Sequence, residues 1–295
     1  MADNETSAFS KAIAAVSAFG PPLAVITALL VYFGWARSDA QARAMGLDVS
    51  LFGYSVQDYV LRSIRSLFVP LVLLAAAAIL WVALDRWVTG AEMAARHHHA
   101  VRRCGLAAIA VGTAVATVTF ASTFLQGGAD ASFLPYVMAA GVLLAAWGSH
   151  VRRQVPASAA HAAAGTTPSG TAPSALKNRS LESVLVFSVV TLLLFWGTAD
   201  FAQAVGRGLA VQVEQNVGTM PRAAVYSDAR LAIGVPQVTE TSLGTAAAPL
   251  YKYQGLRLLV VSGGNYFFLH NGWTLRTGTV VVLPDDHSIR VELGN

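Results

Sequence analysis

The stretch HHHAVRRC, residues 97–104, brings together residue types that could bind a metal ion. It holds three adjacent histidines and Cys104, the single cysteine of the chain. Zinc sites usually show ligands in spaced pairs, and three consecutive histidines on a helix or strand cannot all face one ion. We therefore expect no metal ion and no cofactor, and we interpret the stretch as a basic segment near anionic lipid headgroups.

Asp285, Asp286 and His287 form the second group that could do chemistry, as metal ligands or as an acid and a base. They follow Pro284 in a predicted hairpin, where aspartate favours the turn because it hydrogen-bonds to its own backbone. The sequence holds no serine elbow, no cysteine and histidine pair, no glycine-rich phosphate loop and no paired carboxylates in an apolar run. We therefore predict that the protein is not an enzyme.

Most of the chain that surrounds these candidate residues is predicted to form apolar helices. Of 295 residues, 55% are hydrophobic and 12% charged, whereas about a quarter of the residues in a soluble domain are charged. The apolar residues come in runs long enough to cross a lipid slab of about 30 Å as a helix. The predicted spans are residues 12–35, 67–84, 104–125, 133–149 and 181–199. Basic residues flank the spans instead of forming a stripe with aromatics, so we expect membrane lipids and no nucleic acid as partners.

The distribution of lysine and arginine predicts the orientation of these spans. The segments on the side of the N-terminus hold Lys11, Arg86, Arg96, Arg102, Arg103, Arg152, Arg153, Lys177 and Arg179. The other side has Arg37, Arg43, Arg62 and Arg65 in its first loop and none in residues 126–132. The positive-inside rule then favours a plasma-membrane protein with a cytoplasmic N-terminus and an extracytoplasmic C-terminal part. Residues 155–178, rich in small residues and Ser/Thr, are predicted to form a flexible cytoplasmic linker.

The first outer loop carries signals for two helices. Residues 38–45 can form a short helix that Gly46 ends, and Ser55 and Asp58 have the spacing of a capping box for a new helix. The apolar side of that second helix consists of Val56, Tyr59, Val60 and Ile64. This pattern predicts a surface-lying helix that leads into the second span, with a docking site for a partner or the floor of a pore mouth as alternatives.

The third span is rich in small residues. Ala108, Gly112 and Ala116 lie four apart on one face, a pattern that lets membrane helices approach closely. Thr113 and Thr117, with other hydroxyl residues of the span, could instead line a polar path. We favour helix packing, since hydroxyl groups in membrane helices more often bond to their own backbone or to a neighbouring helix.

Asp200 is the most informative acid near a span end. If the fifth helix is shifted inward by a turn, its carboxylate is partly buried and could pair with Arg62, Arg65 or Arg207. The alternative is a plain anion at the membrane interface.

The period of the sequence changes to that of strands after about residue 218. Predicted strands lie at 256–261, 266–270, 273–276, 279–283 and 288–293, with weaker ones at 223–227, 231–234 and 237–241. We therefore predict a five-helix membrane bundle over residues 1–210 and a small antiparallel sheet or partly closed barrel over 218–295. Such a β domain is near the lower size limit for folding alone without disulfides, so we expect it to dock on the bundle or on other copies.

Aromatic residues of the β domain are candidates for a binding face for sugars or peptidoglycan. They are Tyr251, Tyr253, Tyr266, Phe267, Phe268 and Trp273. Alternating strand positions place some of them in the core, so core packing is the interpretation that we favour.

Three segments, residues 45–71, 253–273 and 280–293, resemble a group of uncharacterised multi-pass membrane proteins of high-GC Gram-positive bacteria. The resemblance supports the domain order and implies no activity. We expect a non-enzymatic membrane protein that presents an extracytoplasmic β domain for binding or assembly, as a homo-oligomer, with envelope components or another membrane subunit as possible partners. The alternative is a channel or transporter subunit with the third span lining the pore.

Overall fold

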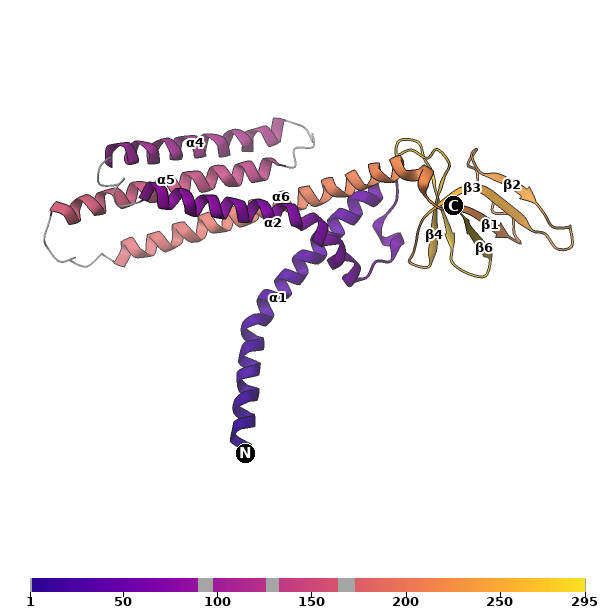
Figure 1. Cartoon of the computed structure of the whole chain (residues 1–295), viewed down its shortest axis with the longest axis horizontal. Helices are drawn as coiled ribbons and strands as arrows, with labels where there is room; N and C mark the ends of the chain where they lie inside the picture. Colours follow the sequence, from indigo (N-terminus) through magenta and orange to yellow (C-terminus); the bar gives the residue numbers. More distant parts are fainter. Residues whose placement is uncertain (1, 90–97, 126–132, 164–172, 295) are drawn as a thin grey trace. The chain divides into compact units, whose positions relative to one another are not determined.

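A computed structural model describes the backbone of residues 2–89, 98–125, 133–163 and 173–294, and the side chains of 23–83, 85–86, 103–123, 133–152 and 181–294. The α-helices are α1 (Ala2–Ala44), α2 (Val56–Thr89), α4 (His98–Leu125), α5 (Leu134–Ala163) and α6 (Pro173–Asn216) (Figure 1). Two short 3₁₀ helices are η1 (Val49–Phe52) and η2 (Val217–Thr219). The strands are β1 (Arg222–Ser227), β2 (Thr239–Ser242), β3 (Tyr251–Ser262), β4 (Asn265–His270), β5 (Val280–Pro284) and β6 (Ile289–Gly294).

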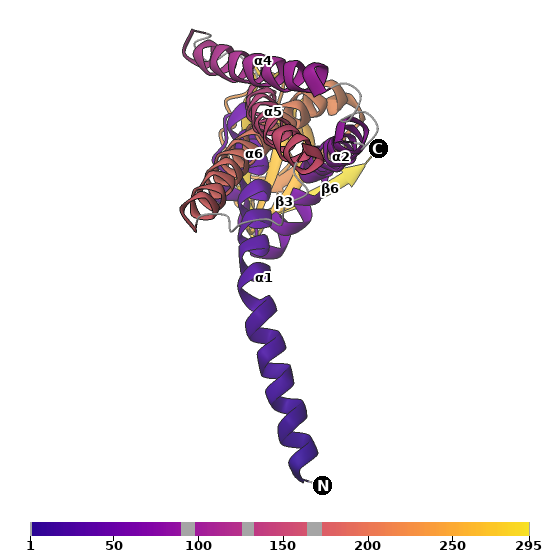
Figure 2. The ribbon, with the colours of Figure 1, turned by 90° about the vertical axis from the view of Figure 1, so that its left-hand side faces the viewer.

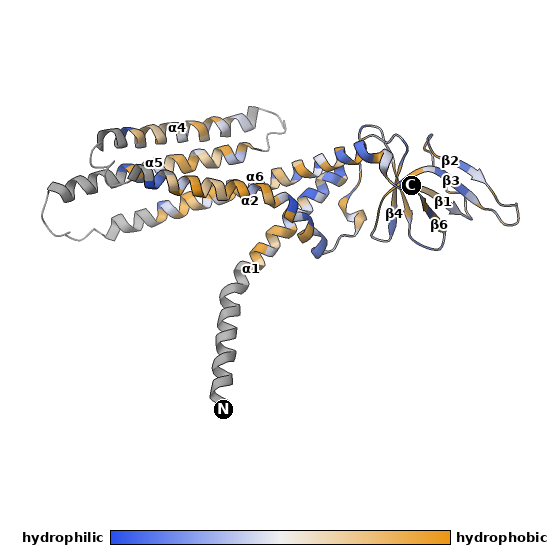
Figure 3. Ribbon diagram, viewed as in Figure 1, coloured by the Kyte–Doolittle hydropathy of each residue, from blue (hydrophilic) through white to orange (hydrophobic). Residues whose placement is uncertain are grey.

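Five helices are long and apolar enough to cross a membrane within the described side chains. Their spanning stretches are Leu23–Ala44, Val56–Ala83, Arg103–Thr123, Leu134–Arg152 and Leu181–Thr219. Most of the side chains in these stretches are not buried inside the chain. The hydrophobic residues of the helices are orange in Figure 3. The prediction of five apolar helices followed by an antiparallel sheet domain is confirmed.

The helices are longer than the sequence suggested. Residues 38–44 continue α1 instead of forming a separate helix, because no breaker precedes Gly46, whose φ of +74° ends the turn after α1. The predicted surface-lying helix is likewise the first part of α2, which continues through Pro70. Helices α5 and α6 also extend into the predicted linker, to Ala163 and from Pro173, because alanine-rich segments favour helix. Residues 164–172 lie outside the described part.

The chain divides into two compact units, which we describe separately. One comprises residues 68–201, and the other comprises residues 1–67 together with 202–295. This division differs from the boundary near residue 210 expected from the sequence, because it groups the sheet with the end of α1, the start of α2 and the end of α6.

In the unit of residues 68–201, helices α4 and α5 lie side by side in both ribbon views (Figures 1 and 2). Glycines allow their close approach. A Cβ atom on Gly112 would lie 2.6 Å from the backbone of Gly141 and Ala145, and one on Gly148 would lie 2.6 Å from the carbonyl oxygen of Gly105. Backbone contact of this kind requires that no side chain stands between the helices.

The sheet is antiparallel, with strand order β5-β4-β3-β1-β6, and β2 pairs with the first part of β3. Strands at both ends of this order contribute to one core: Leu283 of β5 and Val291 of β6 both pack in the cluster around Tyr253 and Phe268. The sheet is therefore curled, so that one of its faces encloses a core.

Two of the predicted strands are wrong. Residues 231–234 are irregular because Ala232 has a φ of +47°, while Leu231 and Ile233 still cover the core. Residues 273–276 lie in two successive turns, in which the Trp273 N–H donates to the His270 carbonyl oxygen at 3.1 Å and the Gly278 N–H donates to the Thr274 carbonyl oxygen at 2.8 Å. Both segments contain apolar residues, which predicted strands. These residues are buried because irregular segments and turns cover the sheet, and not because the segments pair with a strand.

The other face of the sheet packs against helix ends. Phe267 of β4 lies in a cluster with Ala42 of α1 and Val49 and Phe52 of η1. Leu269 of the same strand lies in a second cluster with Met45, Ala210 of α6, Val217 of η2 and Trp273. The β domain therefore docks on residues of the helices, as its small size predicts.

Candidate functional site

The junction between sheet and helices is organised around a stack of side chains. The ring of Phe52 stacks on Phe267 at 4.6 Å between centroids and on Tyr54 at 5.2 Å. The guanidinium of Arg62 then lies 3.8 Å over the Tyr54 ring. The stack leads from the core of the sheet to a cation near the start of α2, and each step contributes aromatic or cation–π attraction.

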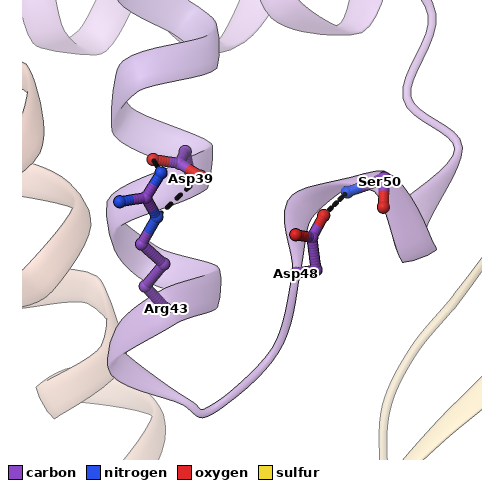
Figure 4. Close-up of polar contacts among 4 residues, drawn as sticks. All are labelled: Asp39, Arg43, Asp48 and Ser50. Carbon is purple, nitrogen blue, oxygen red and sulfur yellow. Dashed lines mark hydrogen bonds and ion pairs between the residues drawn. The ribbon is translucent and has the colours of Figure 1, made fainter.

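Local hydrogen bonds shape the loop that carries Phe52 and Tyr54. Asp48 caps η1, because its Oδ1 accepts the N–H of Ser50 at 2.8 Å (Figure 4). Hydrogen bonds from Ser50 lower the pKa of Asp48, so the cap stays charged at neutral pH. Gly53 ends η1 with a φ of +57°, a conformation that favours glycine.

The capping box predicted for the next helix is formed. The Asp58 carboxylate accepts both the N–H and the hydroxyl of Ser55 at 2.8 Å, and the Asp58 N–H reaches back to Ser55 Oγ at 3.3 Å. This reciprocal arrangement fixes where α2 starts. It therefore sets the position of Arg62, one turn further along.

A cavity of about 170 Å³ lies between α1, η1, α2 and β3. Its polar wall consists of Ser38, Gln41, Tyr54 and Arg62, and the rest of the wall is apolar, including Met45 and Leu259. Ser38 is only 4% exposed, and its Oγ has no hydrogen-bond partner among the described residues. Burial raises the pKa of the Tyr54 hydroxyl, against the opposing charge of Arg62, so Tyr54 stays neutral at physiological pH.

A second cavity, of about 430 Å³, lies in the unit of residues 68–201, between α2, α5 and α6. Its wall includes Asp85, His150 and Glu182 beside apolar residues such as Trp81 and Phe187. Asp85 accepts the Trp147 indole N–H at 3.3 Å. Carboxylates and histidine that line one cavity could exchange protons or attract a cation.

The aromatic residues proposed as a binding face lie in or against the cores. Tyr253, Phe267, Phe268 and Trp273 are almost fully buried. Tyr251 and Tyr266 are partly buried against the core around Tyr253. The Tyr253 hydroxyl accepts the Leu231 N–H at 2.8 Å, which ties down the irregular segment over the core. The four buried rings pack in the cores, and a binding role of Tyr251 and Tyr266 stays a prediction.

Of the residues proposed in the third span, the small ones lie at a helix interface. Ala108 is buried with Trp147 and Val151 of α5, and Ala116 lies close to Gly141. In contrast, Thr113 and Thr117 are exposed on the chain. Thr113 Oγ1 donates to the Ile109 carbonyl oxygen at 2.7 Å, so the hydroxyl bonds to its own helix. A pore-lining role of Thr113 and Thr117 stays a prediction.

The proposed ion-pair residues fall in separate units. Asp200 belongs to the unit of residues 68–201, and Arg62, Arg65 and Arg207 belong to the other. Within its own unit Arg62 stacks on Tyr54 and accepts, through its carbonyl oxygen, a hydrogen bond from Arg37. Its partnership with Asp200 stays a prediction.

Among the described side chains, no three histidine, cysteine, aspartate or glutamate residues are placed so that they could hold one metal ion. His97 lies outside the described residues, and so do the side chains of the next two histidines. Near the other candidate cluster, the Asp286 carboxylate accepts the Ser288 N–H at 2.8 Å, and hydrogen bonds from Ser288 lower its pKa. Asp286 therefore stabilises the turn between β5 and β6.

The sequence interpretation missed both cavities. The sequence pattern alone predicts no site at Asp85, His150 and Glu182, although alternating spans bring these three residues to the same predicted membrane face. The sequence does not predict the cavity beside Arg62, because Leu259 and Ser38, which both line it, are far apart in sequence. Only the capping box of Ser55 and Asp58 is recognisable in the sequence, and it sets the start of α2 and hence the position of Arg62.

The chain matches no family model, no curated protein and no solved structure. The likeness to membrane proteins of high-GC Gram-positive bacteria therefore stays a prediction from the sequence. The function proposed below is therefore argued from the geometry of the chain alone.

Proposed function

We propose that this chain is a non-enzymatic plasma-membrane protein whose β domain works outside the cell as a rigid binding or assembly module, as part of a homo-oligomer. One observation carries the proposal: Phe267 and Leu269, on one face of the sheet, share cores with the ends of α1 and α6 and with η1. A domain that shares cores with helix ends is held firmly, whereas a domain on a linker moves freely. A partner bound to the sheet would therefore be held at a fixed position relative to these helices.

Strands β1, β3 and β6 offer a polar contact surface around Tyr226, which is partly exposed on the sheet face opposite the core around Tyr253. Its ring lies between the Arg290 guanidinium, at 4.5 Å, and the Lys252 ammonium, at 5.4 Å, and its hydroxyl donates to Glu292 at 3.0 Å. These four residues come from three adjacent strands. Cations around a partly exposed ring suit an anionic or polyhydroxylated envelope component better than an apolar ligand.

The orientation in this proposal is tested by labelling cysteines from outside the cell. We expect the variant Asp286→Cys, made together with Cys104→Ser, to react with a membrane-impermeant maleimide on intact cells, because the turn at 286 is exposed. The wild-type protein is the control. Its exposed Cys104 lies at the predicted cytoplasmic end of α4 and should react only in inverted vesicles. The reverse pattern would remove the extracytoplasmic role.

Assembly is tested separately, by native mass spectrometry of the full chain in mild detergent. We expect a single complex with more than one copy. A protein that stays monomeric at every concentration would contradict the homo-oligomer, and the binding role would then need a different partner.

The cavity around Asp85, His150 and Glu182 supports a second candidate, a transporter subunit that handles protons or cations. It differs from the alternative of a pore along the third span, which stays a prediction. Proteoliposomes with a pH-sensitive dye would show ion-driven proton flux that Asp85→Asn and Glu182→Gln reduce together. Flux that is absent, or equal in the variants, contradicts this candidate.

A further inference from the structure

The cavity between α1, η1, α2 and β3 has one polar group, the Ser38 hydroxyl, that its own walls leave unsatisfied. Ser38 Oγ is buried without a hydrogen-bond partner in the described part of the chain, although a helical serine can bond to its own backbone. The Arg62 guanidinium covers the Tyr54 ring but donates to no carboxylate there. A buried polar group without a partner costs free energy, and a ligand can supply the partner.

The charge around the cavity is positive. Arg37 Nη1 donates to the Arg62 carbonyl oxygen at 2.6 Å, and the charges of Arg62 and Arg65 both act on Arg37. The Arg37 guanidinium therefore lies within the field of two other guanidinium groups. None of them forms an ion pair with a described residue of this unit.

The acids nearby are already engaged. Asp58 attracts Arg62 from one turn earlier, but its carboxylate accepts the two hydrogen bonds of the capping box. Asp39 pairs with Arg43 at 3.0 Å (Figure 4). Positive charge is thus left over beside a cavity that has hydroxyl and amide donors, which is the environment that an oxyanion prefers.

The size of the cavity selects among anions. About 170 Å³ is several times the volume of about 30 Å³ that a water molecule occupies in the liquid. It is also smaller than pockets for drug-sized ligands, which start at about 300 Å³. A phosphate group with part of its ester fits between these limits.

We propose that this cavity binds a phosphate oxyanion, with Arg62 as its charged donor and Ser38 and Gln41 as neutral donors. The favoured source is the headgroup of a phospholipid. The apolar exposed face of α1 runs from Leu23 to Trp35, and Trp35 lies one turn before Ser38. An acyl chain can follow that face while its phosphate reaches the cavity, and Trp35 is of the residue type enriched at headgroup level. This proposal does not rest on the binding role of the sheet or on the orientation of the chain.

The test uses the full chain, purified in detergent and stripped of lipid, and measures ligand binding by native mass spectrometry. The probes are phosphatidylglycerol, diacylglycerol as the matched lipid without phosphate, and inorganic phosphate alone. We expect saturable binding of one phosphatidylglycerol per chain and much weaker binding of diacylglycerol. Equal binding of the two lipids would overturn the proposal, since it would show that the acyl chains alone are bound.

Variants assign the binding to the cavity. Arg62→Gln should weaken phosphatidylglycerol binding roughly tenfold or more, because it removes charge-assisted hydrogen bonds. Ser38→Ala, which leaves the stack on Tyr54 intact, should weaken it less. Arg43→Gln is the control, since Arg43 is a cation of α1 that lies outside the cavity wall and pairs with Asp39. If Arg62→Gln and Ser38→Ala both bind like the wild type, the site is elsewhere and the proposal fails.

Two further measurements remove ambiguity. Arg62→Lys retains the charge and should recover part of the binding, and circular dichroism with thermal unfolding identifies any variant that does not fold. If the Arg62 variants do not fold, the binding of phosphatidylglycerol by Ser38→Ala tests the proposal. Inorganic phosphate that binds as tightly as the lipid, with the same dependence on Arg62, would retain the oxyanion site but overturn the lipid as its source.

Discussion

At the scale of single residues, Tyr54 links the aromatic stack to the cation of Arg62, and its hydroxyl is sensitive to alkaline pH. Burial raises the pKa of Tyr54 above the ordinary value of 10.0. A raised pKa of an acid in the folded state adds stability that is fully present below the unfolded pKa and is lost as the pH rises through the folded pKa. The protein should therefore lose stability above about pH 10.

The variant Tyr54→Phe isolates this contribution. We expect its apparent melting temperature to fall less steeply than that of the wild type between neutral pH and pH 11, since the other tyrosines still titrate in both proteins. Melting curves at several pH values measure the difference. Identical slopes would mean that Tyr54 is not buried as described.

Phe52 contacts both the sheet and Tyr54, so its removal should open the junction. It is 6% exposed and stacks on two rings. Phe52→Ala should cost about 3–5 kcal/mol in unfolding free energy, the range for a buried phenylalanine. Phe133→Ala is the matched control, because Phe133 is 61% exposed. Equal losses in chemical denaturation of the two variants would contradict the role of the stack.

At the scale of elements, the pairing of α4 with α5 depends on small residues at fixed positions. Gly112→Val would force Cβ and two further carbons against the backbone of Gly141 and Ala145. We expect a loss of about 1–3 kcal/mol, as for overpacking of a core. Its neighbour Thr113→Val provides the control, since it replaces an exposed side chain with one of the same shape.

Thermal unfolding in detergent, followed by the fluorescence of the chain, measures this pair of variants. Trp147 reports on the interface, because it packs on Ala108. If Thr113→Val were the more damaging change, the third span would use its hydroxyl face for packing, and the glycine face would have another role.

At the scale of the whole molecule, the unit that contains the sheet depends on contact between the β3–β4 turn and η1. Ser262 Oγ donates to the Phe52 carbonyl oxygen, and a Cβ atom on Gly263 would lie 2.9 Å from the Leu51 carbonyl oxygen. The next glycine, Gly264, has a positive φ as well but faces open space. Substitutions at the two glycines therefore distinguish the effect of backbone strain, which both share, from the effect of contact with η1, which only Gly263 makes.

We expect Gly263→Ala to be less stable than Gly264→Ala by about 1–3 kcal/mol, because both are strained but only the first is also overpacked. Limited proteolysis of the β domain and thermal unfolding give the comparison. Equal stability would indicate that the hairpin does not rest on η1, and the rigid coupling in the proposed function would fail with it.

The sequence by itself determined which segments are helices or strands, since that information lies in neighbouring residues. The apolar runs predicted five helices, the spacing of Ser55 and Asp58 predicted the start of α2, and the turn residues predicted most strands. Where this reasoning failed, as at residues 231–234 and 273–276, apolar residues are buried by turns that pack on the sheet. Local patterns cannot distinguish that form of burial from a strand.

Only the tertiary structure decided which side chains meet. The hydrogen bond from Ser262 to Phe52 joins residues 210 positions apart, and the cavity beside Arg62 combines α1, α2 and β3. The aromatics proposed as a binding face are buried because the sheet curls and rests on helix ends, which no alternation along one strand reveals. The periodicity of apolar residues and the turn signals are local properties of the chain, whereas the convergence of side chains depends on how distant segments pack.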